Sequence, residues 1–291
     1  MRPRVGITLG DVAGIGPEVV HSALTSGSLP QTAEYVIVGD YPDCSLGQPT
    51  PATARAAATA LEESVRRARA GELCAVVTGP IHKARMYEIG FAFPGQTEFF
   101  ASRCGVENFA MLLTGGRLTV ALVTAHTALA DVPTALKTSE IVRVGRLLEE
   151  FLRQRNITSP RIAVAGLNPH AGESGALGRE EIEVIAPAVT ELQSVGDGAS
   201  FAGPFSPDTI FFHATNGDWD GVLCMYHDQG LIPLKLHAFH EGVNVTLGLP
   251  FPRTSPDHGT AFEIAGKGIA RADSMIAAIK LAVELTGSPG S

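Results

Sequence analysis

The sequence contains little charge, few aromatic residues and no long hydrophobic run. Only 18% of its 291 residues are charged and 6% are aromatic, and the formal net charge is −8 at pH 7. Binding to a phosphate backbone requires a basic stripe, and none is visible, so nucleic acid is not expected as a partner. No apolar stretch approaches the roughly 20 residues that a membrane-spanning helix needs, so a membrane role is not expected either.

Cysteine is also scarce, and its spacing excludes two common uses. The four cysteines form no CxxC pair and no zinc-binding pattern; they are Cys44, Cys74, Cys104 and Cys224. We interpret them as reduced thiols. The chain enters a predicted strand at Val5, which leaves no room for a signal peptide. Together these features predict a cytoplasmic protein.

The residues that are abundant are typical of an α/β enzyme. The 32 glycines and 19 prolines suit tight turns, and the 45% hydrophobic content allows a large core in one domain or in two joined lobes. Apolar runs predict strands at 5–9, 35–39, 74–78, 108–113, 118–124, 162–166, 221–225 and 243–249. Helical spacing predicts helices at 17–24, 52–70, 139–154, 179–192 and 272–285. A turn at Gly203-Pro204, a short apolar element at 207–212 and a helix-like segment after residue 261 complete the prediction.

The stretch from residue 221 to residue 270 contains many polar and charged side chains whose burial would be costly unless they bind a ligand or one another. Its first predicted strand ends just before His227 and Asp228. Open α/β sheets bind ligands at the carboxyl edge of their strands, so an imidazole and a carboxylate are expected at such an edge.

Three further polar residues in this stretch predict an anion site. Lys235 and Arg253 stand in largely apolar surroundings, where an unpaired charge is expensive. Asn244 lies on the intervening predicted strand and can add a directional amide. We expect loops between strands to bring the three together on a phosphate or carboxylate. The alternative is that the two cations are ordinary surface residues.

Three histidines share a position near the end of a predicted strand: His126, His170 and His227. Imidazoles that converge in this way could hold a divalent cation with open positions for substrate oxygens. Possible partners for these rings are Asn168, Asp228 and Gln229. The alternative is that each ring is satisfied by backbone hydrogen bonds.

Two glycine-containing turns can be interpreted in two ways. Residues 10–18 are either a tight strand-to-helix turn or a contact for a ligand, although the spacing matches neither the dinucleotide fingerprint nor the P-loop. Residues 257–261 are either a structural turn or a loop that a nucleotide approaches closely. Thr97 is a plausible helix cap whose hydroxyl could instead face a ligand.

Five motifs spread along the chain carry a family resemblance. They are Gly10-Asp11-x-Ala13-Gly14-Ile15-Gly16-Pro17-Glu18, Gly95-x-Thr97-Glu98-Phe99, Gly166-Leu167-Asn168-Pro169-His170-Ala171-Gly172-Glu173, Met225-Tyr226-His227-Asp228-Gln229-Gly230 and Asn244-Val245-Thr246-Leu247-Gly248-Leu249-Pro250. Together they resemble the 4-hydroxythreonine-4-phosphate dehydrogenase family of pyridoxal phosphate biosynthesis, over essentially the whole chain. Residues 257–270 also resemble the nucleotide-binding loop of the isocitrate and isopropylmalate dehydrogenases, whose fold the family shares.

This resemblance implies an α/β fold with two lobes, a mostly parallel central sheet and flanking helices, as in isocitrate and isopropylmalate dehydrogenases. Residues 1–291 would form a single unit of two interleaved lobes. The active site would lie in the cleft between the lobes, at the interface of a homodimer.

The resemblance also implies three sets of contacts. A divalent metal, zinc or else magnesium or cobalt, would be bound by histidines from both subunits, namely His126, His170 and His227. NAD or NADP would be bound near His258, Gly259, Thr260 and Ala261. The contacts to a small phosphorylated hydroxy acid would be Gln96, Thr97, Lys235, Asn244 and Arg253. Lys235 is in addition a candidate proton shuttle.

The implied reaction is an NAD(P)-dependent, metal-assisted oxidation of 4-phosphooxy-L-threonine. The β-keto acid formed would lose carbon dioxide to give 3-amino-2-oxopropyl phosphate, a step of pyridoxine 5'-phosphate biosynthesis. Lys235, Asn244 and Arg253 favour a phosphorylated substrate.

Two residues depart from the family's pattern. Gln96 stands where the family usually has histidine, and Val12 where it usually has proline. Glutamine can donate a hydrogen bond but cannot become cationic near neutral pH. The substrate could therefore be 4-phosphoerythronate, 4-phosphothreonate or an aromatic dihydrodiol. Rival hypotheses are a metal-dependent lyase or hydrolase of sugar phosphates without a nicotinamide, and a non-catalytic protein that binds a phosphorylated metabolite.

Overall fold

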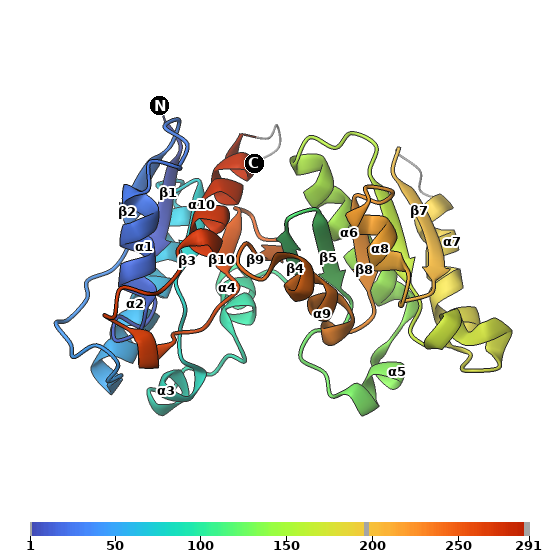
Figure 1. Ribbon diagram of the computed structural model, residues 1–291, viewed down its shortest axis with the longest axis horizontal. Coiled ribbons are helices and arrows are strands. Elements are labelled where there is room, and N and C mark those ends of the chain that lie inside the picture. Colours follow the sequence, from blue (N-terminus) through green and yellow to red (C-terminus); the bar gives the residue numbers. More distant parts are fainter. Residues whose placement is uncertain (1, 195–197, 288–291) are drawn as a thin grey trace. The chain divides into compact units, whose positions relative to one another are not determined.

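The computed structural model of the chain describes residues 2–194 and 198–287 (Figure 1). These residues divide into two compact units. Unit 1 combines the described parts of Met1–Glu107 and Val243–Ser291, and unit 2 is Asn108–Gly242. The chain therefore leaves the first unit, builds the second and returns.

Unit 1 contains a five-stranded, mostly parallel arrangement in the order β2-β1-β3-β10-β9. Its strands are β1 (Arg4–Thr8), β2 (Glu34–Ile37), β3 (Ala75–Thr78), β9 (Val243–Leu247) and β10 (Arg253–Pro256). β1 pairs in parallel with β2 and β3, and β10 pairs in parallel with β3. Only β9 runs antiparallel, beside β10. β1 and β3 consequently end at the same edge, at Thr8 and Thr78.

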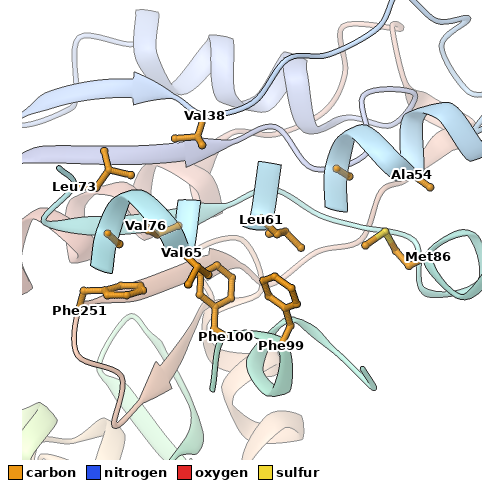
Figure 2. Close-up of a cluster of buried hydrophobic side chains, with 12 residues drawn as sticks. Val38, Ala54, Leu61, Val65, Leu73, Val76, Met86, Phe99, Phe100 and Phe251 are labelled. Carbon is orange, nitrogen blue, oxygen red and sulfur yellow. The ribbon is translucent and has the colours of Figure 1, made fainter. Parts of the chain in front are cut away.

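Helices cover the strands of unit 1 because their apolar residues recur at helical spacing. They are α1 (Gly16–Thr25), α2 (Pro51–Arg69), α3 (Lys83–Glu88), α4 (Gln96–Cys104) and α10 (Asp273–Thr286), with a short 3-10 turn η4 (Phe262–Ile264). α10 packs against β10, β3 and β1. Figure 2 shows the core in which α2 and α4 pack, where Leu61 and Val65 of α2 and Phe99 and Phe100 of α4 surround Val76 of β3.

Unit 2 contains a second set of five strands in the order β4-β5-β8-β6-β7. They are β4 (Ala110–Gly115), β5 (Leu118–Leu122), β6 (Arg161–Ala165), β7 (Ser200–Phe205) and β8 (Gly221–Cys224). β4 and β5 form an antiparallel hairpin, whereas the pairs β5-β8, β8-β6 and β6-β7 are parallel. β5, β8 and β6 are thus consecutive parallel strands whose carboxyl ends share an edge.

The helical elements of unit 2 lie on both faces of its strands. They are α5 (Val132–Ala135), α6 (Thr138–Gln154), α7 (Ala186–Ser194), α8 (Ile210–Thr215) and α9 (His227–Ala238), with 3-10 turns η1 (Leu129–Asp131) and η2 (Pro169–Gly175) and a π-helical turn η3 (Glu181–Ile185). Val222 and Cys224 of β8 face α8 and α9 in one cluster, whereas Leu223 points to α6. This alternation is the period of two that a strand buried on both faces requires.

The α/β class and most of the predicted elements are confirmed, including the hairpin and the helices 52–70, 139–154 and 272–285. The short apolar element predicted at 207–212 is present, and its residues 210–212 begin helix α8. Two predictions are wrong. Gly203-Pro204 lies inside strand β7. Residues 262–264 form only a 3-10 turn, with the last helix starting at Asp273.

No helix in the described part of the chain is both long and apolar enough to cross a membrane.

Candidate active-site residues

Arg253 is the centre of a buried polar cluster in unit 1. Its side chain is only 2% exposed although it is the first residue of β10. One terminal nitrogen, Nη2, donates hydrogen bonds to Thr78 Oγ1 and, at 2.9 Å, to Gln96 Oε1, and Nη1 donates to Thr246 Oγ1 at 3.2 Å. The guanidinium also lies 5.3 Å from the centre of the Phe100 ring, in cation–π contact. All three hydrogen-bond acceptors are neutral.

The charge of Arg253 is therefore incompletely compensated. Burial lowers the pKa of its guanidinium to about 9, an effect that the charge of Glu98 partly opposes. The group remains cationic at pH 7, and its Nε is buried without a hydrogen-bond partner. A buried cation with an unused donor is costly, and an anionic oxygen would relieve that cost.

Gln96 holds Arg253 by both ends of its amide. Its Oε1 accepts the hydrogen bond from Arg253, and its Nε2 donates to the backbone oxygen of Gly79 at 3.1 Å. This arrangement defines the orientation of the amide. Gln96 thus positions the guanidinium, and direct contact with a substrate stays a prediction.

Thr97 and Asn244 belong to the same part of unit 1. The prediction that Thr97 caps a helix is wrong: Gly95 precedes α4, and Thr97 is the second residue of the helix. Its buried hydroxyl lies 3.3 Å from Thr246 Oγ1. Asn244 shares a face of β9 with Thr246, because alternate residues of a strand point the same way. Its Oδ1 is buried without a hydrogen-bond partner and so would accept from a ligand.

Lys235, the third residue of the predicted anion site, lies in unit 2 on helix α9. It is half-buried there. Asn244 lies on a strand, β9, as predicted. The expectation that loops between strands bring the other two to the site is wrong, because Arg253 starts β10 and Lys235 is helical.

The predicted cofactor segment packs against the first glycine-rich loop. Ile15 donates its backbone N–H to the backbone oxygen of Thr260 at 2.9 Å. A Cβ at position 14 would come within 2.5 Å of that oxygen, so only glycine allows this approach. Residues 10–18 therefore form a tight turn that supports the segment at 257–261.

His258 has a buried ring nitrogen without a hydrogen-bond partner in this segment. Its Nδ1 lies 3.1 Å from the backbone oxygen of Gly259 and its Nε2 is buried without a partner. Burial lowers the pKa of His258, so the neutral ring is favoured. With the proton on Nδ1, Nε2 is an acceptor that suits an amine or hydroxyl of a bound cofactor.

In unit 2 the structure brings two of the three predicted imidazoles together. Thr124 donates its backbone N–H and its hydroxyl to the backbone oxygen of Met225, so the segments that follow β5 and β8 run side by side. This pairing places the ring centres of His126 and His227 6.0 Å apart. His227 Nδ1 lies 2.7 Å from Asp228 Oδ1. When Nδ1 carries the proton, Nε2 keeps its lone pair for a metal.

His170 lies on the loop after β6 and does not join this pair. The pKa of the Asp208 carboxyl is lowered mainly by the hydrogen bond from Ser206, and His170 adds a smaller electrostatic contribution in the same direction. Among residues 2–194 and 198–287, no three histidine, cysteine, aspartate or glutamate side chains are close enough to hold a metal. One copy of the chain thus shows two imidazoles of the predicted triad together.

Sequence reasoning missed Thr78 and Thr246 as partners of Arg253. Both are threonines on mainly apolar strands, β3 and β9, and both are buried. The available signal was a threonine near the end of an apolar strand, where its hydroxyl could serve as a hydrogen-bond partner. This signal is weak, because threonine is β-branched and is common in strands for that reason alone.

Comparison with known proteins identifies the family. The sequence model of the family described as "Pyridoxal phosphate biosynthetic protein PdxA" matches residues 16–282. This chain belongs to the PdxA family. A relative named 4-hydroxythreonine-4-phosphate dehydrogenase, from Caulobacter vibrioides, is 52% identical over 84% of this chain and 75% of its own length. Another of the same name, from Desulfosudis oleivorans, is 42% identical over 97% of this chain and 96% of its own length.

Solved structures agree with this assignment. The crystal structure of 4-hydroxythreonine-4-phosphate dehydrogenase from Klebsiella pneumoniae aligns with a TM-score of 0.82 and 34% identity, covering 98% of this chain and 99% of that one. Isocitrate dehydrogenase from Methylococcus capsulatus aligns with a TM-score of 0.57 and 15% identity over 98% of this chain and 86% of that one, which shows a shared fold alone. The predicted family, the predicted fold class and the predicted type of enzyme, a dehydrogenase acting on a CH–OH group, are confirmed.

Proposed function

We propose that this PdxA-family chain oxidises 4-phosphooxy-L-threonine with NAD or NADP and a divalent metal. The resulting β-keto acid decarboxylates to 3-amino-2-oxopropyl phosphate in pyridoxine 5'-phosphate biosynthesis. The buried guanidinium of Arg253, held by neutral oxygens and left with a free Nε–H, is the observation that carries the proposal. The names of the close relatives support the same substrate.

The substrate phosphate is assigned to Arg253. A phosphate oxygen provides the negative charge that the surrounding threonines and Gln96 do not supply, and charge-assisted hydrogen bonds are the strong ones. Asn244 offers its buried Oδ1 to a hydroxyl or ammonium group of the substrate. Thr97 and Lys235 complete the proposed substrate contacts, and Gln96 contributes by orienting Arg253.

The proposed metal ligands are His126, His170 and His227, contributed by both subunits. The separation of 6.0 Å between the His126 and His227 ring centres suits two ligands of one ion, since each Zn–N bond is about 2.0–2.1 Å. The carboxylate of Asp228 orients the His227 ring. Zinc, magnesium or cobalt would supply Lewis acidity that lowers the pKa of the substrate alcohol.

The nicotinamide cofactor is assigned to His258, Gly259, Thr260 and Ala261. The orphaned Nε2 of His258 is a buried acceptor, and the first glycine-rich loop holds the segment in place. Lys235 is the proposed proton shuttle, because it carries a half-buried primary amine, a group type that serves as a general base in enzymes.

A homodimer is proposed because the three proposed metal ligands do not come together among the described residues of one copy. Helix α9, which starts at His227 and carries Lys235, exposes Ile232 and Leu236, and Phe239, which follows the last residue of the helix, is exposed as well. Leu236 is 88% exposed, which is unfavourable in water and typical of an interface. A cytoplasmic location remains the expectation from the sequence.

The decisive experiment compares the wild type with His170→Ala on a panel of phosphorylated and unphosphorylated hydroxy acids, each with NAD and NADP and with zinc. We expect NADH or NADPH formation with 4-phosphooxy-L-threonine in the wild type and its loss in the variant. Near-normal turnover by His170→Ala would contradict the metal scheme. Substrate turnover without reduction of the cofactor would instead support a lyase.

Gln96 favours one second candidate, oxidation of 4-phosphoerythronate or 4-phosphothreonate. Both substrates keep the phosphate group that is assigned to Arg253. Gln96, which replaces the family's usual histidine, lies beside Arg253, so the replacement leaves the phosphate contact itself unchanged. The same panel distinguishes them by their kcat/KM values.

A further inference from the structure

Glu181 is a buried carboxylate that the proposed reaction does not use. It opens the π-helical turn η3 and is only 3% exposed. Within the described residues, no arginine, lysine or histidine forms an ion pair with it. A buried carboxylate without a cation needs several hydrogen-bond donors.

The donors come from the start of the loop that carries His170. Glu181 Oε1 accepts the backbone N–H groups of Leu167 and Asn168, each at 2.7 Å. Glu181 Oε2 accepts from Asn168 Nδ2 at 3.0 Å. One carboxylate therefore binds the two residues that immediately follow Gly166, at the point where the chain leaves β6.

The loop itself has an unusual backbone. His170, Ala171, Gly172, Glu173 and Ser174 have φ values of 52°, 51°, 79°, 43° and 56°. Four of these five are not glycine, and the left-handed region is unfavourable for such residues. The loop can persist in this shape only if its surroundings hold it.

The Glu181 carboxylate lies directly against this loop. A Cβ at position 172 would come within 2.6 Å of Glu181 Oε2, so the backbone of Gly172 passes close to the carboxylate. The carboxylate therefore contacts the loop before and after His170.

A second buried side chain connects this loop to the end of β8. Gln229 donates from Nε2 to the backbone oxygen of Gly166 at 2.6 Å, and its Oε1 accepts the backbone N–H of Met225 at 2.7 Å. Because Met225 precedes His227 by two residues, Gln229 couples the start of the His170 loop to the segment that carries His227.

We propose that Glu181 is the positioning residue for His170: its carboxylate holds the left-handed loop so that the imidazole is ready to bind the divalent cation. This inference rests on the proposed role of His170 as a metal ligand. Both carboxylate oxygens of Glu181 accept hydrogen bonds from Leu167 and Asn168, so in this inference its loss weakens metal binding rather than the chemical step.

The test is calorimetric titration of the full-length chain with Co²⁺, with the visible spectrum of bound cobalt as a second measurement. Glu181→Gln keeps the size of the side chain but replaces a carboxylate oxygen by an N–H donor that faces Asn168 Nδ2. We expect about 10- to 100-fold weaker Co²⁺ binding, as for other groups that orient metal ligands. Saturating cobalt should restore most of kcat.

Glu183→Gln is the matched control. Glu183 lies in the same π-helical turn, but it is exposed and pairs with Arg179 at 2.6 Å. The control removes the same charge without touching the loop, so its Co²⁺ affinity should equal that of the wild type. If Glu183→Gln weakens binding as much as Glu181→Gln, the effect is one of charge and the inference is wrong.

Asn168→Ala covers the case in which Glu181→Gln does not fold. It removes only the side-chain donor to Glu180 and Glu181 and leaves both backbone hydrogen bonds to Glu181. We expect a several-fold loss of Co²⁺ affinity with a normal circular dichroism spectrum. Unchanged affinity in both folded variants overturns the inference.

The inference and the proposed function can fail separately. Cobalt that binds to the wild type, is lost in His170→Ala and is retained in Glu181→Gln contradicts the role of Glu181 alone. A wild type that binds no cobalt, or a His170→Ala variant that binds it normally, contradicts the proposed metal site and this inference with it.

Discussion

The two regions that we assign to ligands differ in how their side chains are held. In unit 1, Arg253 is 2% exposed, and three neutral oxygens orient its guanidinium inside the core. In unit 2, His126 is exposed and His227 is half-buried, and His170 lies on a left-handed loop. The Arg253 region is buried and charged and is fixed by hydrogen bonds. The histidine region is more exposed to solvent and depends on neighbouring side chains for its geometry.

This difference follows from what each group costs before a ligand binds. The buried guanidinium of Arg253 is charged at neutral pH, so it must be surrounded by acceptors even when no phosphate is present. An imidazole has a neutral form that needs no counter-ion, so it can remain near the surface until a metal is bound. We therefore expect substitutions at Arg253 and its partners to act on substrate affinity, and substitutions around His126 and His227 to act on metal affinity.

The largest effect is expected for Arg253→Met. Loss of a buried, hydrogen-bonded cation should lower kcat/KM for 4-phosphooxy-L-threonine by about 100- to 1000-fold. The unphosphorylated analogue should lose much less, because it lacks the group that Arg253 binds. Arg85→Met, at an exposed arginine of unit 1 that pairs with Glu88, is the control. Equal losses for both substrates would contradict the assignment of the phosphate.

A smaller effect, confined to unit 2, is expected for Asp228→Asn. The amide orients the His227 ring less strongly than the carboxylate, so Co²⁺ affinity should fall about 10- to 100-fold while KM at saturating metal stays unchanged. Asp218→Asn is a matched control, since Asp218 Oδ2 lies 2.9 Å from His213 Nδ1 in an exposed pair. Cobalt binding that is insensitive to Asp228→Asn would show that His227 needs no orienting partner.

Gln96→His should have a modest effect that depends on pH. A neutral imidazole can accept from Arg253, but a protonated one cannot and repels the guanidinium. We expect kcat/KM to fall roughly threefold near pH 8 and about tenfold near pH 6. Gln31→His, at an exposed glutamine, should follow the wild-type pH profile. An increase in activity at either pH would mean that Gln96 does not serve to hold Arg253.

The smallest effect is expected on stability, through His258. Its pKa is lowered in the folded state, mainly by burial, so below the ordinary value of about 6.5 the unfolded chain binds more protons. His258 therefore makes stability fall as pH drops below about 6.5, until the pH reaches the folded pKa. His258→Asn should reduce the fall in Tm between about pH 7.5 and pH 5.5 by a few degrees at most. Identical pH profiles of Tm for the two proteins would exclude this contribution.

The strands, and the polar residues that follow them, were predictable because an apolar run in the sequence indicates a buried strand without reference to distant residues. Apolar runs such as 118–124 and 221–225 became β5 and β8, and the residues just beyond them include His126 and His227. Helix α9 was missed because Gly230 and Pro233 lower helix propensity, and the packing of Leu231 and Leu234 in the core outweighs that preference.

The partners of Arg253 and Glu181 were not predictable in the same way. Thr78 and Gln96 reach Arg253 from β3 and α4, far away in the chain. The parallel pairing of β10 with β3 brings Thr78 there, and the position of α4 brings Gln96. The spacing of apolar residues predicted that Glu181 lies on the helix at 179–192. Its burial beneath the His170 loop depends on the left-handed backbone of that loop, which no spacing of residues indicates.

By itself, the sequence determined the α/β class, the family and which side chains carry charge or a lone pair, because these depend on residue type and on short-range periodicity. Only the tertiary structure decided which of these groups are buried, which meet and which keep an unused donor or acceptor. The physical reason is that the cost of burying a polar group depends on neighbours supplied by distant parts of the chain.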